Sequence, residues 1–142
     1  MDVYVKIVET VAEKESVLSI RRDVFIRGLN IPKHIEIDEN ENNANYVLAT
    51  VGETPVGTAR WRKTDEGIKL ERFAVLDGYR SMGVGRIMTE FIINQFSGNE
   101  HIYLNSQDTA IGFYEKLGFE SVGPMFQEAG IQHQKMVYPK GE

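Results

Sequence analysis

Residues 70–88 read LERFAVLDGYRSMGVGRIM. The stretch begins as an apolar run that suits a buried strand, breaks at Asp77, and passes through Arg80-x-x-Gly83-x-Gly85 directly into a helical pattern. A strand that leads through a glycine loop into a helix brings several free backbone N–H groups to one point, beside the positive end of the helix dipole. This arrangement predicts an anion site, with a phosphate or pyrophosphate as the expected ligand.

Two common phosphate-binding loops do not fit this stretch. A dinucleotide-binding fingerprint needs a third glycine at position 88, where the chain has Met88. A Walker loop needs Gly-Lys-Ser or Gly-Lys-Thr, and the sequence contains neither. Gly83 and Gly85 still allow a close approach of backbone and ligand, while Arg80 and Arg86 supply positive charge. The alternative interpretation is a helix start that simply requires small residues.

Composition narrows the classes of protein. The chain has 142 residues, a formal net charge of −5, three histidines and no cysteine. A length of this order favours one domain, and the acidic balance argues against a general nucleic-acid binder. The missing cysteines exclude disulfides and thiolate nucleophiles, and the scattered histidines lack metal-ligand spacing. No signal-peptide pattern and no apolar run of about 20 residues is present, so we expect a cytoplasmic protein without membrane segments.

Hydrophobic periodicity and turn residues predict ten elements of secondary structure. We expect strands at about 3–8, 46–51, 56–62, 68–76, 101–105, 119–123 and 132–138, and helices at about 13–28, 83–96 and 109–118. A long polar loop is expected at 30–45. Because hairpins and helical crossovers both occur, this order predicts an α/β fold with a mixed sheet.

The glycine loop resembles the coenzyme A pyrophosphate loop of the GNAT superfamily of acetyl-CoA-dependent N-acetyltransferases. The resemblance continues in residues 55–62 (PVGTARWR), 104–107 (LNSQ) and 110–119 (AIGFYEKLGF). Gly130-Ile131-Gln132-His133 favours the small ElaA/YjcF-like branch of that superfamily, as does the segment from Arg22 to Phe25. One departure is Arg27-Gly28, where that branch usually has Glu-Gln.

The resemblance implies a fold and a cofactor. A single N-acetyltransferase domain would span residues 1–142, with a mixed, mostly antiparallel central sheet flanked by helices. Two neighbouring parallel strands of that sheet would splay apart, and by position these are the strands that end at Val75 and Asn105. Acetyl-CoA would place its pantetheine arm in the gap, and no metal is implied.

The same resemblance assigns residues to the cofactor. Those implied are Phe73, Ala74, Val75, Arg80, Ser81, Met82, Gly83, Val84, Gly85, Arg86, Asn105, Ala110, Phe113 and Tyr114. Backbone groups of Phe73 and Val75 would pair with the pantetheine amides, and Asn105 would hydrogen-bond the arm. From the residues alone, Asn105 could equally be a cap that ends its strand.

Catalytic roles follow for a smaller set. The resemblance makes Tyr114 the acid that protonates the departing thiolate, and makes the Phe73 N–H the group that polarises the thioester carbonyl. The alternative for Tyr114 is core packing. A base is needed because deprotonating an ordinary primary amine at pH 7 costs about 4.6 kcal/mol. Glu71, expected on the same strand face as Phe73, and His133, with Glu128 just upstream, are the two candidates. Glu71 could instead form an ion pair, and His133 could be structural.

Strand alternation also places Arg60 and Arg62 on one face and Trp61 on the other. Either this is a solvated face beside a core tryptophan, or the two arginines contact a substrate anion.

These observations predict an enzyme that transfers an acetyl group from acetyl-CoA to a primary amine of a small molecule or peptide, by direct attack in a ternary complex. Without cysteine, a cysteinyl intermediate is impossible. The alternatives are a non-catalytic coenzyme A-binding module, an acyltransferase that uses another acyl-CoA, and a domain that binds ATP or NAD through the same loop. A homodimer is possible.

Overall fold

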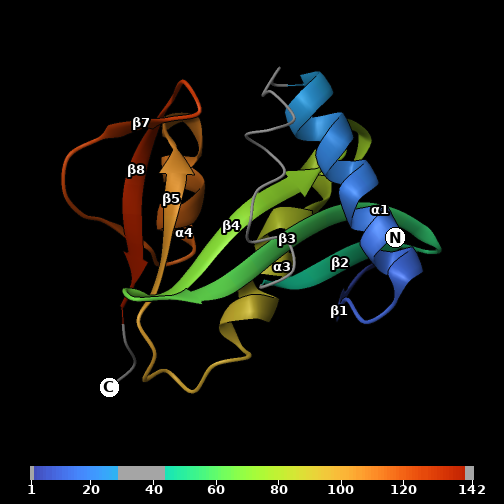
Figure 1. The fold of residues 1–142 in the computed structure, drawn as a ribbon, viewed down its shortest axis with the longest axis horizontal. Coiled ribbons are helices and arrows are strands. Elements are labelled where there is room, and N and C mark those ends of the chain that lie inside the picture. The colour runs from blue at the N-terminus through green and yellow to red at the C-terminus, as the bar shows by residue number, and fades with distance from the viewer. Residues whose placement is uncertain (1, 29–43, 140–142) are drawn as a thin grey trace.

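The computed structural model describes residues 2–28 and 44–139, in which one eight-stranded sheet forms the centre of the molecule (Figure 1). The strands are β1 (Val3–Ile7), β2 (Asn45–Val51), β3 (Thr54–Thr64), β4 (Gly67–Val75), β5 (Ile102–Gln107), β6 (Glu120–Ser121), β7 (Phe126–Glu128) and β8 (Ile131–Tyr138). Their order is β1-β2-β3-β4-β5-β8-β6, and β7 pairs with β8. Only β4 and β5 run parallel, so the predicted mixed, mostly antiparallel sheet is confirmed.

Helices cover both faces of this sheet. They are α1 (Val11–Arg21), the π-helix η1 (Arg22–Gly28), the short 3₁₀ helices η2 (Asp77–Met82) and η3 (Asp108–Ala110), α3 (Val84–Ile93) and α4 (Ile111–Lys116). Helix α1 packs against β2, β3 and β4 on the side that we call the front face (Figure 1). Helix α3 packs against β1 to β4, and α4 against β5 and β6, on the opposite side, the rear face.

The first helix differs from its prediction at both ends. Its N-cap is Thr10, whose side chain accepts a hydrogen bond from the Glu13 N–H while the Glu13 carboxylate accepts from the Thr10 N–H. This capping box starts the helix at Val11, two residues earlier than expected. The α-helix ends at Arg21 and continues as η1, so one uniform helix over residues 13–28 was wrong. The predicted loop at 30–45 lies outside the described residues except at its end, where Asn45 begins β2.

Each face of the sheet carries its own cluster of buried apolar residues. The rear cluster includes Leu70 and Trp61 of the sheet with Met88 of α3 and Tyr114 of α4. The front cluster joins α1 to strand residues such as Ala74. Buried residues on both sides of the sheet fix the register of every central strand, because a slip by one position would exchange the two sets.

The parallel pair opens into a fork, as predicted. The strands β4 and β5 pair only at Ile68 with Ile102, Lys69 with Tyr103, and Leu70 with Leu104. Beyond that row β4 continues to Val75 and β5 to Gln107 without pairing to each other. Their facing backbone groups are therefore available to a ligand inside the fork.

A β-bulge lies at the point where the fork opens. Thr58 pairs with Ala74, but Arg60 pairs with Glu71, so β4 has one extra residue against β3. Arg72 takes up the extra length with a φ of 56°, in the left-handed region that non-glycine residues seldom adopt. The bulge reverses the alternation of side chains along the second half of β4.

Candidate active site

The glycine loop has the geometry of an anion site. Gly83 has a φ of 76° and caps the N-terminus of α3. The first backbone bond of this helix runs from the Ile87 N–H to the Gly83 carbonyl at 3.0 Å. The N–H groups of Val84, Gly85 and Arg86 therefore have no partner within the helix and point out from its positive end. The Val84 side chain is fully buried in the core, so only its backbone can serve a ligand.

Two arginines flank this helix start. Arg80 donates from Nε to the Val75 carbonyl at 3.1 Å and pairs with Asp77 at 2.9 Å. Arg86 pairs with Glu90 one turn along α3 at 2.9 Å. Both side chains are more than half exposed. They therefore retain donors for phosphate oxygens beside the free N–H groups.

Helix α4 closes the other side of the loop. A Cβ placed on Gly85 would lie 3.3 Å from the Phe113 ring, a tight contact, so glycine lets this ring lie directly against the helix start without displacement. Phe113 is 40% exposed and is thus a surface aromatic rather than a core residue. It also contacts Tyr114 edge-on, with ring centroids 4.9 Å apart.

Tyr114 lies on the rear side of the fork. Its ring is buried among Phe73, Phe113 and Phe119, with centroids within 5.8 Å in each case. Burial raises the pKa of the Tyr114 hydroxyl well above its ordinary value, so the group stays protonated. No described residue hydrogen-bonds this hydroxyl, and no buried side-chain N or O atom of the described chain lacks a partner. The hydroxyl therefore reaches solvent-accessible space, which core packing alone would not require.

Backbone directions along β4 favour a ligand in the fork. The Leu76 N–H donates to the Val56 carbonyl of β3 at 2.9 Å, and the Ala74 carbonyl faces Gly57 of the same strand. Because successive residues of a strand direct their backbone groups to opposite sides, those of Phe73 and Val75 point toward β5. These are the two residues whose backbone was expected to pair with pantetheine.

The predicted common face of Glu71 and Phe73 was wrong. Phe73 packs in the rear cluster, against Tyr114. Glu71 pairs in register with Arg60, which lies opposite the front-face residue Tyr46. The bulge at Arg72 separates the two faces, and nothing in the sequence marks that bulge, since Arg72 is not a glycine.

Glu71 is held by three cations. Its Oε2 accepts from Arg60 Nε at 2.6 Å and Arg62 Nε at 2.9 Å, and its Oε1 lies 3.2 Å from Lys69 Nζ. Burial would raise the pKa of Glu71, but the hydrogen bond from Arg62 and the charges of Arg60 and Lys69 outweigh it and hold this pKa below its usual value. A carboxylate in these surroundings is a weak proton acceptor, so the ion-pair alternative for Glu71 is confirmed.

The solvated-face alternative for the arginines was wrong. The Arg60 side chain is fully buried and that of Arg62 is 22% exposed. Trp61 lies on the rear face, edge-on to Phe96, as alternation required. Lys69 completes the cluster and was missed, although its position two residues before Glu71 puts both on one strand face.

Asn105 stands at the fork, not at the end of its strand. Strand β5 extends to Gln107, two residues beyond the prediction, because β8 pairs with it along its whole length. Asn105 is the first β5 residue past the last parallel pair and lies opposite Lys135 of β8. A strand-ending cap is thereby excluded.

His133 lies on β8 opposite Gln107, on the same front face as Asn105 and Lys135. It is buried and stacks on Phe126, with ring centroids 6.0 Å apart. Its Nδ1 lies 2.7 Å from the Ile131 carbonyl, which can only accept, so Nδ1 carries a proton. Its Nε2 faces the Glu128 carboxylate at 3.6 Å. With Nδ1 fixed as a donor, Nε2 is the ring nitrogen that could take up a proton.

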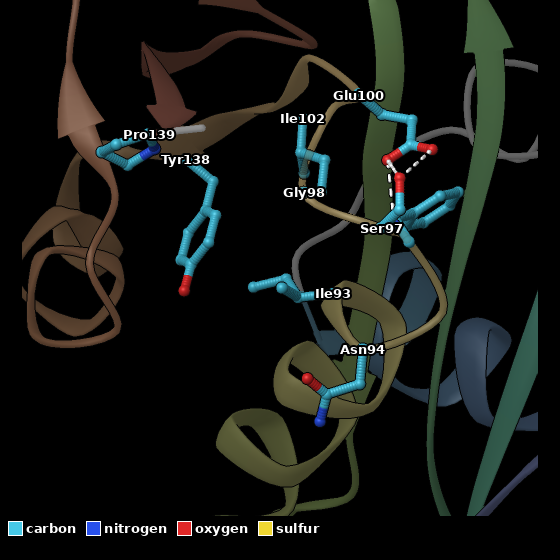
Figure 2. A pocket seen from close by; sticks show the side chains of 9 residues that line it. Ile93, Asn94, Ser97, Gly98, Glu100, Ile102, Tyr138 and Pro139 are labelled. Carbon is cyan, nitrogen blue, oxygen red and sulfur yellow. Dashed lines mark hydrogen bonds between the residues drawn. The ribbon is translucent and has the colours of Figure 1, made fainter. Parts of the chain in front are cut away.

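A cavity in the described part of the chain lies away from these residues. It has a volume of about 170 Å³ and lies between the C-terminal end of α3 and the ends of β5 and β8, where Figure 2 shows Ile93, Asn94, Ile102 and Tyr138 around it. The glycine loop is at the opposite end of α3, and none of the predicted site residues lines the cavity.

The described residues include neither a membrane-spanning helix nor a metal-binding cluster. No helix among them is long and apolar enough to cross a membrane. No group of three or more His, Asp or Glu side chains in the described ranges could hold a metal ion.

A forked mixed sheet with an anion-binding helix start beside the fork defines the acyl-CoA N-acyltransferase fold. Solved structures support this class. The crystal structure of ElaA from Escherichia coli superposes with a TM-score of 0.82 at 21% identity, covering 95% of this chain and 99% of that one. An aminoglycoside 6′-N-acetyltransferase complexed with coenzyme A superposes with a TM-score of 0.74 at 14% identity, covering 94% and 95%.

Sequence comparison gives the family. The profile described as "Acetyltransferase (GNAT) domain" matches residues 24–139. The chain is 39% identical over 121 residues to the uncharacterized N-acetyltransferase YjcF of Bacillus subtilis, covering 83% of this chain and 86% of YjcF. It is 24% identical over 131 residues to ElaA of Escherichia coli, covering 87% and 86%. The chain belongs to the GNAT acetyltransferases, in the ElaA/YjcF-like branch, and is an acyltransferase.

Proposed function

We propose that the protein transfers an acetyl group from acetyl-CoA to a primary amine of a small molecule or peptide. One observation carries this proposal: the unpaired ends of β4 and β5 open between a helix N-terminus with free N–H groups and a buried tyrosine with an accessible hydroxyl. A pyrophosphate, an extended amide-containing arm and a thioester need these three features in this order.

The residues present fit the coenzyme. The N–H groups from Gly83 to Arg86 would hold the pyrophosphate, with Arg80, Ser81 and Met82 of η2 at its edge. The fork would hold the pantetheine arm between Phe73–Val75 on β4 and Asn105 on β5. Phe113 and Ala110 would lie along the same arm from the side of α4.

Bound acetyl-CoA supplies a thioester whose carbonyl carbon accepts the amine lone pair, so that a C–N bond forms and the C–S bond breaks. The Phe73 N–H, which points into the fork, would donate to the carbonyl oxygen as that oxygen gains negative charge. Tyr114 would give its proton to the departing sulfur. Burial among aromatic rings disfavours a thiolate there, which drives the sulfur to take that proton.

We assign the base to His133 rather than to Glu71. Three cations hold Glu71 and lower its pKa. The His133 Nε2 can act as an acceptor, and Glu128 is the charged side chain that faces it among the described residues. Strand β8 is next to β5, about 4.8 Å away, so His133 lies one strand from the edge of the fork. It would take the amine proton directly or through one water, and Glu128 would stabilise the imidazolium formed.

Ligand binding and turnover test the proposal together. In thermal melts, coenzyme A should raise the melting temperature, whereas ATP and NAD should not. A rise with ATP or NAD but not with coenzyme A would contradict the proposal. Acetyl-CoA and a panel of primary amines should then release free thiol. Because the chain has no cysteine, a thiol reagent reports coenzyme A without background. Binding without release on any amine would favour a non-catalytic coenzyme A module, and release with longer acyl-CoAs only would favour a different donor.

A further inference from the structure

Three cations share one carboxylate on the front face at the mouth of the fork. Arg60, Arg62 and Lys69 all contact Glu71, and no second carboxylate among the described residues pairs with Arg62 or Lys69. The side chains of Arg62 and Lys69 are 22% and 16% exposed. These cations are partly removed from water and share the charge of one carboxylate, which raises the free energy of the site. An arriving anion would lower it.

Arg62 and Lys69 both keep unused donors. Arg62 contacts Glu71 through Nε alone, which leaves its two terminal nitrogens without a bond to the described residues. A guanidinium presents these nitrogens as a planar fork that matches a carboxylate. Lys69 has a single contact, at 3.2 Å. Arg60, by contrast, makes further contacts besides those with Glu71.

Arg62 and Lys69 lie close to the place where the acceptor amine would enter the fork. Arg62 and Lys69 are register partners, and Lys69 pairs with Tyr103 in the second of the three parallel rows. Glu71, two residues further along β4, is the first residue past the last paired row. One two-residue step is about 7 Å, so the cationic pair lies just before the point where the amine would meet the fork.

Neighbouring charges on this face do not neutralise the pair. Lys135 of β8 pairs with Glu66 and lies over the Tyr103 ring, 5.1 Å from its centroid. His133 faces Glu128 on β7. Each of these groups has its own partner, and Glu71 is the carboxylate left for Arg62 and Lys69.

We infer that Arg62 and Lys69 bind a carboxylate of the acceptor, so that the preferred substrates are amino acid-like: primary amines that also carry a carboxylate. This inference rests on the proposed acetyl transfer and names its substrate class. The carboxylate would be held on the front face while the amine of the same molecule reaches into the fork.

A matched series of acceptors tests the inference. The panel consists of ω-amino acids with two to six carbons, their carboxamides, and the corresponding amines without a carboxylate. Purified enzyme with acetyl-CoA should acetylate at least one amino acid with a kcat/KM about 10- to 100-fold above that of its carboxamide, the range expected for a charge-assisted hydrogen bond.

Variants locate the preference. Arg62→Gln should raise the KM of the carboxylate substrate about tenfold or more and leave its carboxamide nearly unchanged. Arg62→Lys keeps the charge and should lose only part of the preference, which guards against a folding defect in the first variant. Lys63→Gln removes one cation from the adjacent, rear-facing and exposed position and should change neither substrate.

The outcomes separate the two proposals. Failure of the wild type to bind coenzyme A by calorimetry would overturn acetyl transfer itself. Coenzyme A binding with acetylation of neutral amines and no preference for a carboxylate would overturn only the inference. So would coenzyme A binding with no acetylation of any carboxylated amine, or an Arg62→Gln variant that weakens both substrates equally.

Discussion

The two faces of the sheet differ at the fork in a way that matches two halves of one reaction. On the rear face, Phe73, Phe113 and Tyr114 form an aromatic wall with no ion pair in the described structure. On the front face, Glu71 binds three cations and His133 faces Glu128. An apolar wall suits the departure of a sulfur that must leave neutral, and a charged wall suits the arrival of an amine and its proton.

One residue produces this difference. The extra length at Arg72 lets two neighbouring segments of β4 present Glu71 to the front and Phe73 to the rear. Without the bulge Phe73 would share the front face with Glu71, and its ring would not pack against Tyr114 on the rear face. Substitutions on the two faces should therefore have different effects.

The largest effect is expected at the rear face. Tyr114→Phe removes the proton donor and should lower kcat by about 10²- to 10⁴-fold while the Kd for coenzyme A changes less than about twofold. Tyr138→Phe, at the end of β8 beside the cavity and away from the fork, is the matched control and should leave kcat unchanged. An equal loss in both variants would contradict a specific role for Tyr114.

Glu71→Gln should act on stability at the front face. It removes the carboxylate that the fully buried Arg60 and the partly buried Lys69 both contact, and the free energy of unfolding should fall by about 3 kcal/mol at pH 7 in denaturant titrations. Glu90→Gln, at an exposed pair, should cost less than about 0.5 kcal/mol.

The pH dependence has a definite sign. The pKa of Glu71 is lowered in the folded state, so its contribution is complete above the ordinary glutamate pKa of about 4.3 and is lost as pH falls through the folded-state value. The stability gap between wild type and Glu71→Gln should be constant from pH 7 to about 5 and narrow below about 4. A gap that widens in acid would show that Glu71 is protonated in the native protein.

His133→Gln tests the base on the same face. The variant should lose about 100-fold in kcat/KM at pH 7 and recover most of it near the amine pKa of about 10.4, where the acceptor needs no base. A structural defect would persist at high pH. His101→Gln, at the edge of β5 where the ring stacks on Tyr103, provides the comparison and should show no such recovery because it should show no initial loss.

The smallest effect is expected from a substitution in the glycine loop at the start of α3. Gly83→Ala forces a Cβ into a φ of 76° and should cost about 1 kcal/mol and weaken coenzyme A binding severalfold. Gly112→Ala is the matched control, because nothing lies within 4 Å of its added Cβ. Calorimetry on both variants measures the difference. Equal coenzyme A affinities of the two variants would show that the glycine loop does not bind coenzyme A.

Sequence reasoning reached the parts of this site that depend on local patterns. The Arg80–Gly85 loop, the splayed strands and the sheet-facing Tyr114 follow from glycine spacing, hydrophobic periodicity and the family resemblance. The π-helix η1 and the short β7 gave no periodic signal. The Thr10-x-x-Glu13 capping box was readable, and it would have placed the start of α1 correctly.

The front face was the harder part to predict because it depends on pairing between distant strands. The strand register brings Arg60, Arg62 and Lys69 to Glu71 from two strands. The bulge at Arg72 has no glycine to announce it, and the extra residues of β5 are set by β8, which comes about 30 residues later in the chain.

A crystal structure with coenzyme A would show whether the cofactor lies in the fork. We expect the pyrophosphate on the N–H groups of Gly83 to Arg86, the arm between Phe73–Val75 and Asn105, and the sulfur within about 4 Å of the Tyr114 hydroxyl. Coenzyme A bound in the cavity at the C-terminal end of α3, or a sulfur on the front face beside Glu71 and away from Tyr114, would contradict it.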